Sequence, residues 1–323
     1  MIWKNPAALS EAGSGVLGIG DGSSLQVGVG RAMGHHGELL QGVFEGEGGR
    51  LLRGLVTLPL DRQQSLATFW PRDHGEIRAR PPDRKKAARA TALTLAHLGF
   101  SRMAGDLTIE SDIPVGHGYG SSTADVIATI RAVGSAAGVA LRRSTICRLA
   151  ITAEGASDAI AHHDQAVLFA HREGKIIEHF GGEFPPLIVI GIQTDFSPVD
   201  TLALPPARYN HQEIEQFRVL RGLLYRAVRQ QDPVLIGRVA SMSAHISQRH
   251  SPKPRFDQVA QLANTYGACG VQVAHSGTLI GALFDADQRG VGTPIARFTR
   301  ALEQNGLHRI TAFTVNVDRG ILL

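Results

Sequence analysis

The 323-residue chain contains only two cysteines, Cys147 and Cys269, and these lie far apart in the sequence. Two such cysteines cannot build the disulfide framework of a small secreted protein, and neither has a companion ligand at the spacing of a metal site. This scarcity is typical of proteins in a reducing compartment, so we expect this protein in the cytoplasm.

Long apolar runs are also missing. No run approaches the roughly 20 residues that a membrane-spanning helix requires, so the sequence predicts no membrane partner. Residues 1–23 are rich in glycine and serine and lack the apolar centre of a signal peptide. We therefore expect residues 1–23 to form a poorly ordered extension.

Aromatic residues and net charge are both low, at 6% of the chain and a formal +4. A nucleic-acid-binding surface would need a larger basic face with aromatic side chains between the charges. We interpret the one dense basic run, residues 80–90, as a solvated helix start with a mild attraction for phosphorylated ligands. No nucleic-acid partner is expected.

The chain does have a mixture of helix and strand patterns, and its 43% hydrophobic content suits a globular protein. Glycine-interrupted strand patterns over residues 25–60 precede a helical pattern at 85–98. Residues 186–195 form a buried-type strand beside proline-rich segments, which indicate a domain boundary. We therefore expect an α+β or α/β two-layer architecture with domains at 24–185 and 186–323. Beyond the boundary the pattern predicts helices near 208–231, 233–248, 254–267 and 292–305, and strands near 270–275, 278–284 and 309–317.

The most informative stretch is PVGHGYGSSTAD, residues 114–125, where three alternating glycines precede hydroxyl residues and an apolar helical pattern. A helix N-terminus presents unpaired N–H groups and about half a positive charge. Glycines before it let an anion approach the backbone. The spacing matches neither a P-loop nor the dinucleotide fingerprint. The stretch predicts a polyphosphate site, with a simple capped turn as the alternative.

This stretch resembles the phosphate-binding motif of the GHMP kinases, the superfamily of galactokinase, homoserine kinase and mevalonate kinase. Tyr119 stands where the family usually has leucine. The matching residues are Pro114, Gly118, Gly120, Ser121, Ser122, Thr123 and Ala124. Two later stretches resemble the other family motifs in the same order: AEGASDAIAHHDQAVLF at 153–169 and GACGVQVAHSGTLIGALFD at 267–285.

The resemblance implies a two-domain fold, with an N-terminal domain like ribosomal protein S5 domain 2 and a ferredoxin-like C-terminal domain. It also implies an ATP-dependent kinase that phosphorylates an alcohol. Ser122 and Glu154 would hold Mg²⁺, which prefers oxygen ligands. The residues implied to bind ATP are Pro114, Gly116, Gly118, Gly120, Ser121, Ser122 and Thr123.

Two carboxylates compete for the catalytic role that the resemblance implies. Asp164, in DQAV, matches the family position, and Asp158 is its rival because the spacing differs by a residue between subfamilies. Either would accept or orient the proton of the acceptor hydroxyl. Positioning of the acceptor without a base is another alternative, as is a plain structural role for both aspartates.

Three stretches resemble the L-threonine kinases of cobalamin side-chain assembly in particular: GELLQG at 37–42, SPKPRFDQV at 251–259 and VAHSGT at 273–278. His36 departs from the cysteine often found before GEL in that subfamily. The resemblance implies L-threonine or a related hydroxy amino acid as acceptor. Its candidate contacts are Glu38 and Gln41 for the ammonium group, Ser276, Gly277 and Thr278 in the third motif, and Arg249 or Lys253 for the carboxylate or phosphate.

Two other functions stay open at this point. The first is a kinase of homoserine or of a specialised metabolite, and the second is a nucleotide-binding regulator without turnover. The presence of Ser122, Glu154 and an aspartate argues against the regulator. Adjacent histidines at 35–36 and 162–163 lack further ligands at zinc spacing, so no zinc site is expected. His275 is expected to pack or hydrogen-bond, and a homodimer is implied by the resemblance alone.

Overall fold

The computed structural model describes residues 25–195 and 207–318 of the chain. The expected N-terminal extension, 1–23, and part of the proline-rich boundary segment lie outside these ranges. No helix among the described residues is long and apolar enough to cross a membrane.

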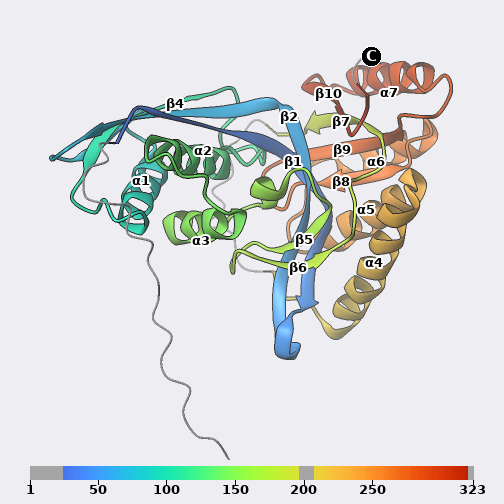
Figure 1. Ribbon diagram of the computed structural model, residues 1–323. Coiled ribbons are helices and arrows are strands. Elements are labelled where there is room, and N and C mark those ends of the chain that lie inside the picture. The colour runs from blue at the N-terminus through green and yellow to red at the C-terminus, as the bar shows by residue number, and fades with distance from the viewer. Residues whose placement is uncertain (1–24, 196–206, 319–323) are drawn as a thin grey trace, which may run out of the picture.

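Two long antiparallel strands organise the molecule, β1 (Gly28–Glu45) and β2 (Leu51–Arg72), joined through the 3-10 turn η1 (Glu47–Gly49). Figure 1 shows them bending together near the middle of the structure. The pairing register shifts on both sides of Glu38, which places irregular backbone there. The sequence predicted shorter strands broken at glycines, but continuous cross-strand pairing keeps the glycines inside the ladder.

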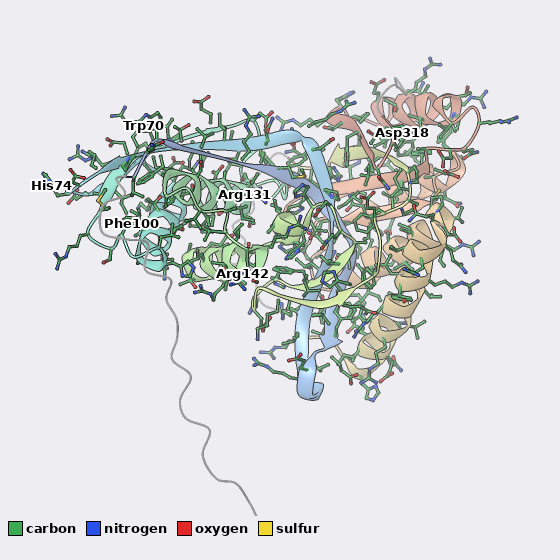
Figure 2. The ribbon with its side chains drawn as sticks, viewed as in Figure 1. Trp70, His74, Phe100, Arg131, Arg142 and Asp318 are labelled. Atoms are coloured by element: carbon green, nitrogen blue, oxygen red, sulfur yellow. The ribbon has the colours of Figure 1, made fainter. Side chains whose placement is uncertain are left out.

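The N-terminal half is a sheet with helices on one face. Strands β4 (Ala104–Ser111) and β3 (Ile77–Arg80) extend the sheet beyond β2. Helix α2 (Ser121–Ala136) packs on β1 and β2, and α1 (Lys85–His97) and α3 (Arg143–Glu154) pack against α2 (Figure 1). Phe69 of β2 is fully buried, whereas Trp70 is 40% exposed (Figure 2), because successive strand residues face opposite sides. The helices therefore cover only one face of this sheet.

The C-terminal half continues the same sheet in the order β10-β7-β9-β8-β1. Glu38 of β1 pairs with Val273 of β8, so the two halves join at the irregular part of β1. The strands are β7 (Leu187–Gln193), β8 (Gly270–Val273), β9 (Leu279–Asp285) and β10 (Ile310–Val315). The helices are α4 (His211–Gln230), α5 (Pro233–Gln248), α6 (Phe256–Thr265) and α7 (Gly292–Gln304).

The predicted helices and most predicted strands are present, within a few residues at their ends. The sequence did not predict the short strands β5 (Val167–Ala170) and β6 (Lys175–His179), which pair with each other, β5 also pairing with β2. Helix α3 ends at Glu154, because Gly155 adopts a left-handed φ of 86°. The chain resumes as the 3-10 turn η2 (Ala159–His162), with Asp158 at its N-cap.

The core falls into two clusters of buried side chains. The larger one includes residues from both halves of the chain, and the smaller one lies among β7, β8, β9, α6 and α7. Together they make an α+β structure, as the sequence predicted. The domain boundary at residue 186 stays a prediction, because the sheet is continuous across both halves.

Candidate active site

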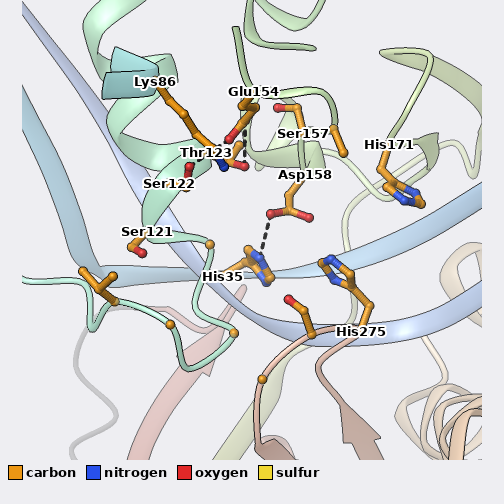
Figure 3. A pocket seen from close by; sticks show the side chains of 17 residues that line it. His35, Lys86, Ser121, Ser122, Thr123, Glu154, Ser157, Asp158, His171 and His275 are labelled. Atoms are coloured by element: carbon orange, nitrogen blue, oxygen red, sulfur yellow. Dashed lines mark hydrogen bonds and ion pairs between the residues drawn. The ribbon is translucent and has the colours of Figure 1, made fainter. Parts of the chain in front are cut away.

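An open cavity of about 270 Å³ lies where the glycine-rich stretch meets the β8–β9 turn and the segment after α3. Figure 3 shows side chains converging on it from β1, α1, α2, α3 and both loops. Its lining residues are His35, Lys86, Val115, Gly116, Gly118, Gly120, Ser121, Ser122, Thr123, Glu154, Ala156, Ser157, Asp158, His171, His275, Ser276 and Gly277.

The glycines of the stretch 114–125 are required by the geometry. Gly116, Gly118 and Gly120 have φ values of 81°, 98° and 71°, which side chains disfavour. A Cβ on Gly118 would lie 2.3 Å from the carbonyl oxygen of Ser276. Backbone therefore packs directly on backbone between this loop and the β8–β9 turn.

The loop ends at the N-terminus of α2. Gly120 is the N-cap in a left-handed conformation, and no described side chain caps the helix. The first-turn residues Ser121, Ser122 and Thr123 line the cavity. Unpaired N–H groups and the positive end of the helix dipole therefore face the cavity, as an anion site requires.

A carboxylate from α3 lies across this helix N-terminus. The hydroxyls of Ser122 and Thr123 donate to the two carboxylate oxygens of Glu154, each at 3.0 Å. Burial and the nearby charge of Asp158 raise the pKa of Glu154 to about 7, against the opposing effects of Thr123 and Lys86. Hydroxyl and carboxylate oxygens are the donors that Mg²⁺ prefers, so this donor set fits that ion.

A buried ion pair occupies the middle of the cavity. His35 Nε2 lies 3.0 Å from Asp158 Oδ2, and both residues are buried. Burial acts to raise the pKa of Asp158, but the charge and hydrogen bond of His35 outweigh it and hold that pKa well below its ordinary value. Burial likewise acts to lower the pKa of His35, and Asp158 and Glu38 raise it overall. Both shifts favour the charged forms, a carboxylate on Asp158 and a protonated ring on His35.

A second pair joins β1 to the β8–β9 turn. Glu38 Oε2 accepts a 2.5 Å hydrogen bond from the backbone N–H of His275, and Oε1 lies 2.8 Å from His275 Nδ1. Burial acts to lower the pKa of His275, but Glu38 and Asp158 raise it to about 9. Lys253 is buried nearby, and burial lowers its pKa to about 8 despite the charge of Glu38.

Three side chains of the kinds that bind metal ions lie together beside the cavity. His35, Glu38 and Asp158 have one ligand atom each within 4.8 Å of one another. His35 Nε2 is engaged with Asp158 and Glu38 with His275, whereas His35 Nδ1 has no hydrogen-bond partner among the described residues. His36, the neighbour of His35, instead lies beside Gln272, whose Nε2 is 2.6 Å from His36 Nδ1. We therefore assign these groups to a network of charged hydrogen bonds.

The structure brings most of the predicted site residues together at one cavity. Asp158 lies at its centre, but Asp164 does not line it. Asp164 is exposed and accepts two 2.7 Å hydrogen bonds from Arg143. The chain turns between these residues, at η2, so two aspartates six positions apart face different surroundings.

Four other predicted residues lie beside or behind the cavity. Gln41 is buried, and its Nε2 donates to the carbonyl of Val273 at 3.3 Å. Glu38 lies behind His275 and is 1% exposed, so it does not meet a substrate ammonium group as expected. Pro114 and Thr278 flank the lining residues.

Seven lining residues were not among the predicted site residues: His35, Lys86, Val115, Ala156, Ser157, His171 and His275. Two of them lie beside or within stretches that resemble the L-threonine kinases: His35 lies two positions before GELLQG, and His275 lies within VAHSGT. Lys86 stands in the basic run that predicted attraction for a phosphorylated ligand. Which lysine of that run reaches the cavity depends on how α1 packs.

A glycine-lined helix N-terminus beside Glu154, facing a buried aspartate, has the anion-binding groups and the carboxylates that phosphoryl transfer needs. The family model of the GHMP kinases N-terminal domain matches residues 85–171, and that of the GHMP kinases C-terminal domain matches 224–291. The chain belongs to the GHMP kinase family, whose members use ATP.

Two relatives with curated functions are L-threonine kinases. The enzyme of Salmonella typhimurium is 28% identical over 282 residues, covering 84% of this chain and 87% of that enzyme. The enzyme of Citrobacter freundii is 28% identical over 192 residues, covering 57% of this chain and 64% of that enzyme.

Solved structures agree on the fold. Homoserine kinase from Cytophaga hutchinsonii aligns with a TM-score of 0.65 at 16% identity, covering 92% of this chain and 97% of that one. Mevalonate kinase from Methanococcus jannaschii aligns with a TM-score of 0.60 at 15% identity, covering 92% of this chain and 99% of that one. Structural similarity at so low a sequence identity supports the two-domain fold, but it does not identify the acceptor.

Proposed function

We propose that this kinase transfers the γ-phosphoryl group of ATP to the hydroxyl of L-threonine or a closely related hydroxy amino acid. The observation that supports this most is the place of Asp158. Figure 3 shows it between the first turn of α2, where phosphates would bind, and the rings of His171 and His275. An acceptor hydroxyl beside Asp158 would face the phosphate loop. The likeness to L-threonine kinases over 84% of the chain supports the acceptor class.

The phosphate end of the cavity would bind ATP through backbone and side chains together. The N–H groups at the start of α2 and the hydroxyl of Ser121 would donate to phosphate oxygens. Lys86 would add a positive charge from α1. Ser122 and Glu154 would hold Mg²⁺, which supplies neutralisation of phosphate charge when bound. Without an ion, the Ser122 and Thr123 hydroxyls keep the Glu154 carboxylate in place.

Asp158 would hold the acceptor hydroxyl in line with the phosphate. The charge of His35 keeps Asp158 ionised, so the carboxylate accepts a hydrogen bond from the hydroxyl. A carboxylate with so low a pKa is a weak base, so its main contribution is orientation. As the acceptor oxygen bonds to the γ-phosphorus, the bond from that phosphorus to the ADP oxygen breaks, and the hydroxyl proton passes to an oxygen of the transferred phosphoryl group.

Homoserine, or a specialised metabolite with a similar hydroxyl, is the second candidate. Its support is the fold likeness to homoserine kinase, which does not define an acceptor. L-Homoserine and L-threonine have the same atoms with the hydroxyl one carbon apart. Distance between the hydroxyl and the amino-acid head group therefore distinguishes the two acceptors.

The experiment is ADP release by the purified full chain with Mg-ATP and L-threonine, L-serine, L-homoserine or mevalonate. We expect turnover with L-threonine at a kcat/KM at least tenfold above the other three. Preference for L-homoserine would move the proposal to the second candidate. Turnover of mevalonate alone would overturn the amino-acid acceptor.

The homodimer and the cytoplasmic location also remain proposals. The family resemblance supports the first, and the two free cysteines, Cys147 and Cys269, support the second. Sedimentation of the full chain, whose mass is 34.5 kDa, tests the dimer directly.

A further inference from the structure

The two ring nitrogens of His275 differ in their contacts: Nδ1 is hydrogen-bonded to Glu38, and Nε2 is open to the cavity. Nδ1 lies 2.8 Å from Glu38 Oε1, and the backbone N–H of His275 donates to the second oxygen. This double contact fixes the ring and makes Nδ1 the donor to Glu38. Within the described part of the chain, no hydrogen bond engages Nε2, and the ring lines the cavity. A protonated His275 therefore offers one N–H to a ligand.

The surroundings of His275 favour a positive charge on the ring. Glu38 and Asp158 stabilise the protonated form more than burial and Lys253 oppose it, which raises its pKa to about 9. The rings of His35 and His171 lie on either side, with centroids 6.4 Å and 5.9 Å from that of His275. His171 is neutral at pH 7, because burial and the charge of His275 lower its pKa to about 4. His275 is thus the charged donor at this end of the cavity.

The cavity has two ends, separated by the Asp158–His35 pair. Figure 3 places Ser121, Ser122, Thr123, Lys86 and Glu154 on one side of Asp158 and His275 with His171 on the other. Phosphates already have a helix N-terminus and Lys86 at the first end. An acceptor whose hydroxyl is at Asp158 would place its remaining atoms toward His275. Among those atoms, an α-carboxylate is the natural acceptor for a charged N–H donor.

We propose that His275, fixed by Glu38, binds the carboxylate of the acceptor through Nε2–H and so selects amino-acid alcohols over simple alcohols. This rests on the proposed function, since it names the acceptor head group that the site recognises. It also gives Glu38 a positioning role, acting through His275, in place of direct contact with the substrate.

The test compares two acceptors that differ only in the carboxylate, L-threonine and 1-amino-2-propanol. For the wild-type chain we expect a kcat/KM for L-threonine about 100-fold above that for the amino alcohol, equivalent to one charged hydrogen bond of about 3 kcal/mol. His275→Gln should raise the KM for L-threonine by 10- to 100-fold with kcat changed less than threefold. The same variant should leave kcat/KM for 1-amino-2-propanol within threefold. His211→Gln, an exposed histidine of α4, is the matched control and should change neither value.

An equal loss for both acceptors would overturn the proposal, because it would place His275 at the phosphoryl group or in a purely structural role. A second readout does not depend on turnover or on a variant. In the ¹⁵N-histidine NMR spectrum, saturating L-threonine should shift the Nε2 signal of His275 and raise its pKa, whereas 1-amino-2-propanol should not. If the wild-type chain phosphorylates no acceptor, the proposed function fails while this signal still decides carboxylate binding. No shift with L-threonine, L-serine or L-homoserine would overturn the inference.

Discussion

Both carboxylate oxygens of Glu38, on β1, are hydrogen-bonded to His275 of the β8–β9 turn, although 237 positions separate the two residues in sequence. The contact lies where β1 pairs with β8 and where the register of the β1–β2 pair is irregular. It therefore joins the two halves of the fold beside the cavity. Because Glu38 is 1% exposed, His275 replaces much of the water that this carboxylate loses on folding.

Replacing Glu38 with glutamine should lower the free energy of unfolding by about 3 kcal/mol at pH 7, as expected for breaking a buried charged pair. The folded-state pKa of His275, about 9, lies above its ordinary 6.5, so the pair stabilises fully below pH 6.5. That contribution declines as the pH rises through 9. Urea unfolding at pH 6, 7.5 and 10 should show the difference between Glu38→Gln and wild type shrinking at the highest pH. The exposed Glu110→Gln is the control, and a pH-independent difference would contradict the assignment.

Asp158→Asn should reduce kcat by about 100-fold, the loss that a misplacement of about 1 Å of a reacting group can cause. The amide keeps the shape but accepts the acceptor hydroxyl weakly and cannot pair with the charge of His35. The KM for ATP should stay within threefold, measured by ADP release. Asp164→Asn is the informative comparison, because Asp164 is exposed and bonded to Arg143. A large loss in Asp164→Asn with little loss in Asp158→Asn would restore the other choice left open by the sequence.

Gly118→Ala should weaken ATP binding by more than tenfold. Its φ is 98°, and the new Cβ would lie 2.3 Å from the carbonyl oxygen of Ser276, so the loop or the β8–β9 turn must move. Gly138→Ala is the matched control, with a φ of 67° and nothing within 4 Å of the added carbon. It should cost about 1 to 2 kcal/mol of stability through backbone strain and leave the ATP dissociation constant unchanged. Calorimetric titration with a non-hydrolysable ATP analogue and thermal unfolding measure the two effects; equal ATP affinity in both variants would contradict the phosphate loop.

Lys86→Met should raise the KM for ATP by about tenfold, equivalent to about 1.4 kcal/mol, because its charge faces the phosphate end of the cavity. Methionine keeps much of the apolar length of the lysine side chain, so the variant removes the charge and leaves the packing nearly unchanged. Lys85→Met is the adjacent control, since Lys85 does not line the cavity and is exposed. Initial rates over a range of ATP concentrations distinguish the two variants. Equal effects would mean that only the overall basic charge of this helix start matters.

Local sequence patterns were sufficient to predict the phosphate loop and most secondary structure. Gly116, Gly118 and Gly120 predict unusual backbone angles, and the helical spacing of apolar residues after them predicts α2. Both signals arise from neighbours within a few positions, so they are readable along the chain. The placement of Glu154 beside Ser122, which followed from the family resemblance, also agrees with the structure.

Tertiary structure alone placed Asp158 at the cavity and Asp164 away from it, and brought His35, Lys86 and His275 to the cavity. Gly155 ends α3 early and η2 reverses the chain, so Asp158 faces His35 while Asp164 faces solvent and Arg143.

The sequence by itself determined an α+β fold with a glycine-rich loop before a helix, because backbone angles and hydrophobic periods depend on local residue types. The resemblance of its motifs to the GHMP kinases indicated the kinase. The sequence did not determine the charge network around the acceptor. Those charges are set by burial and by contacts between β1, η2 and the β8–β9 turn, which only the folded chain brings within 3 Å of one another.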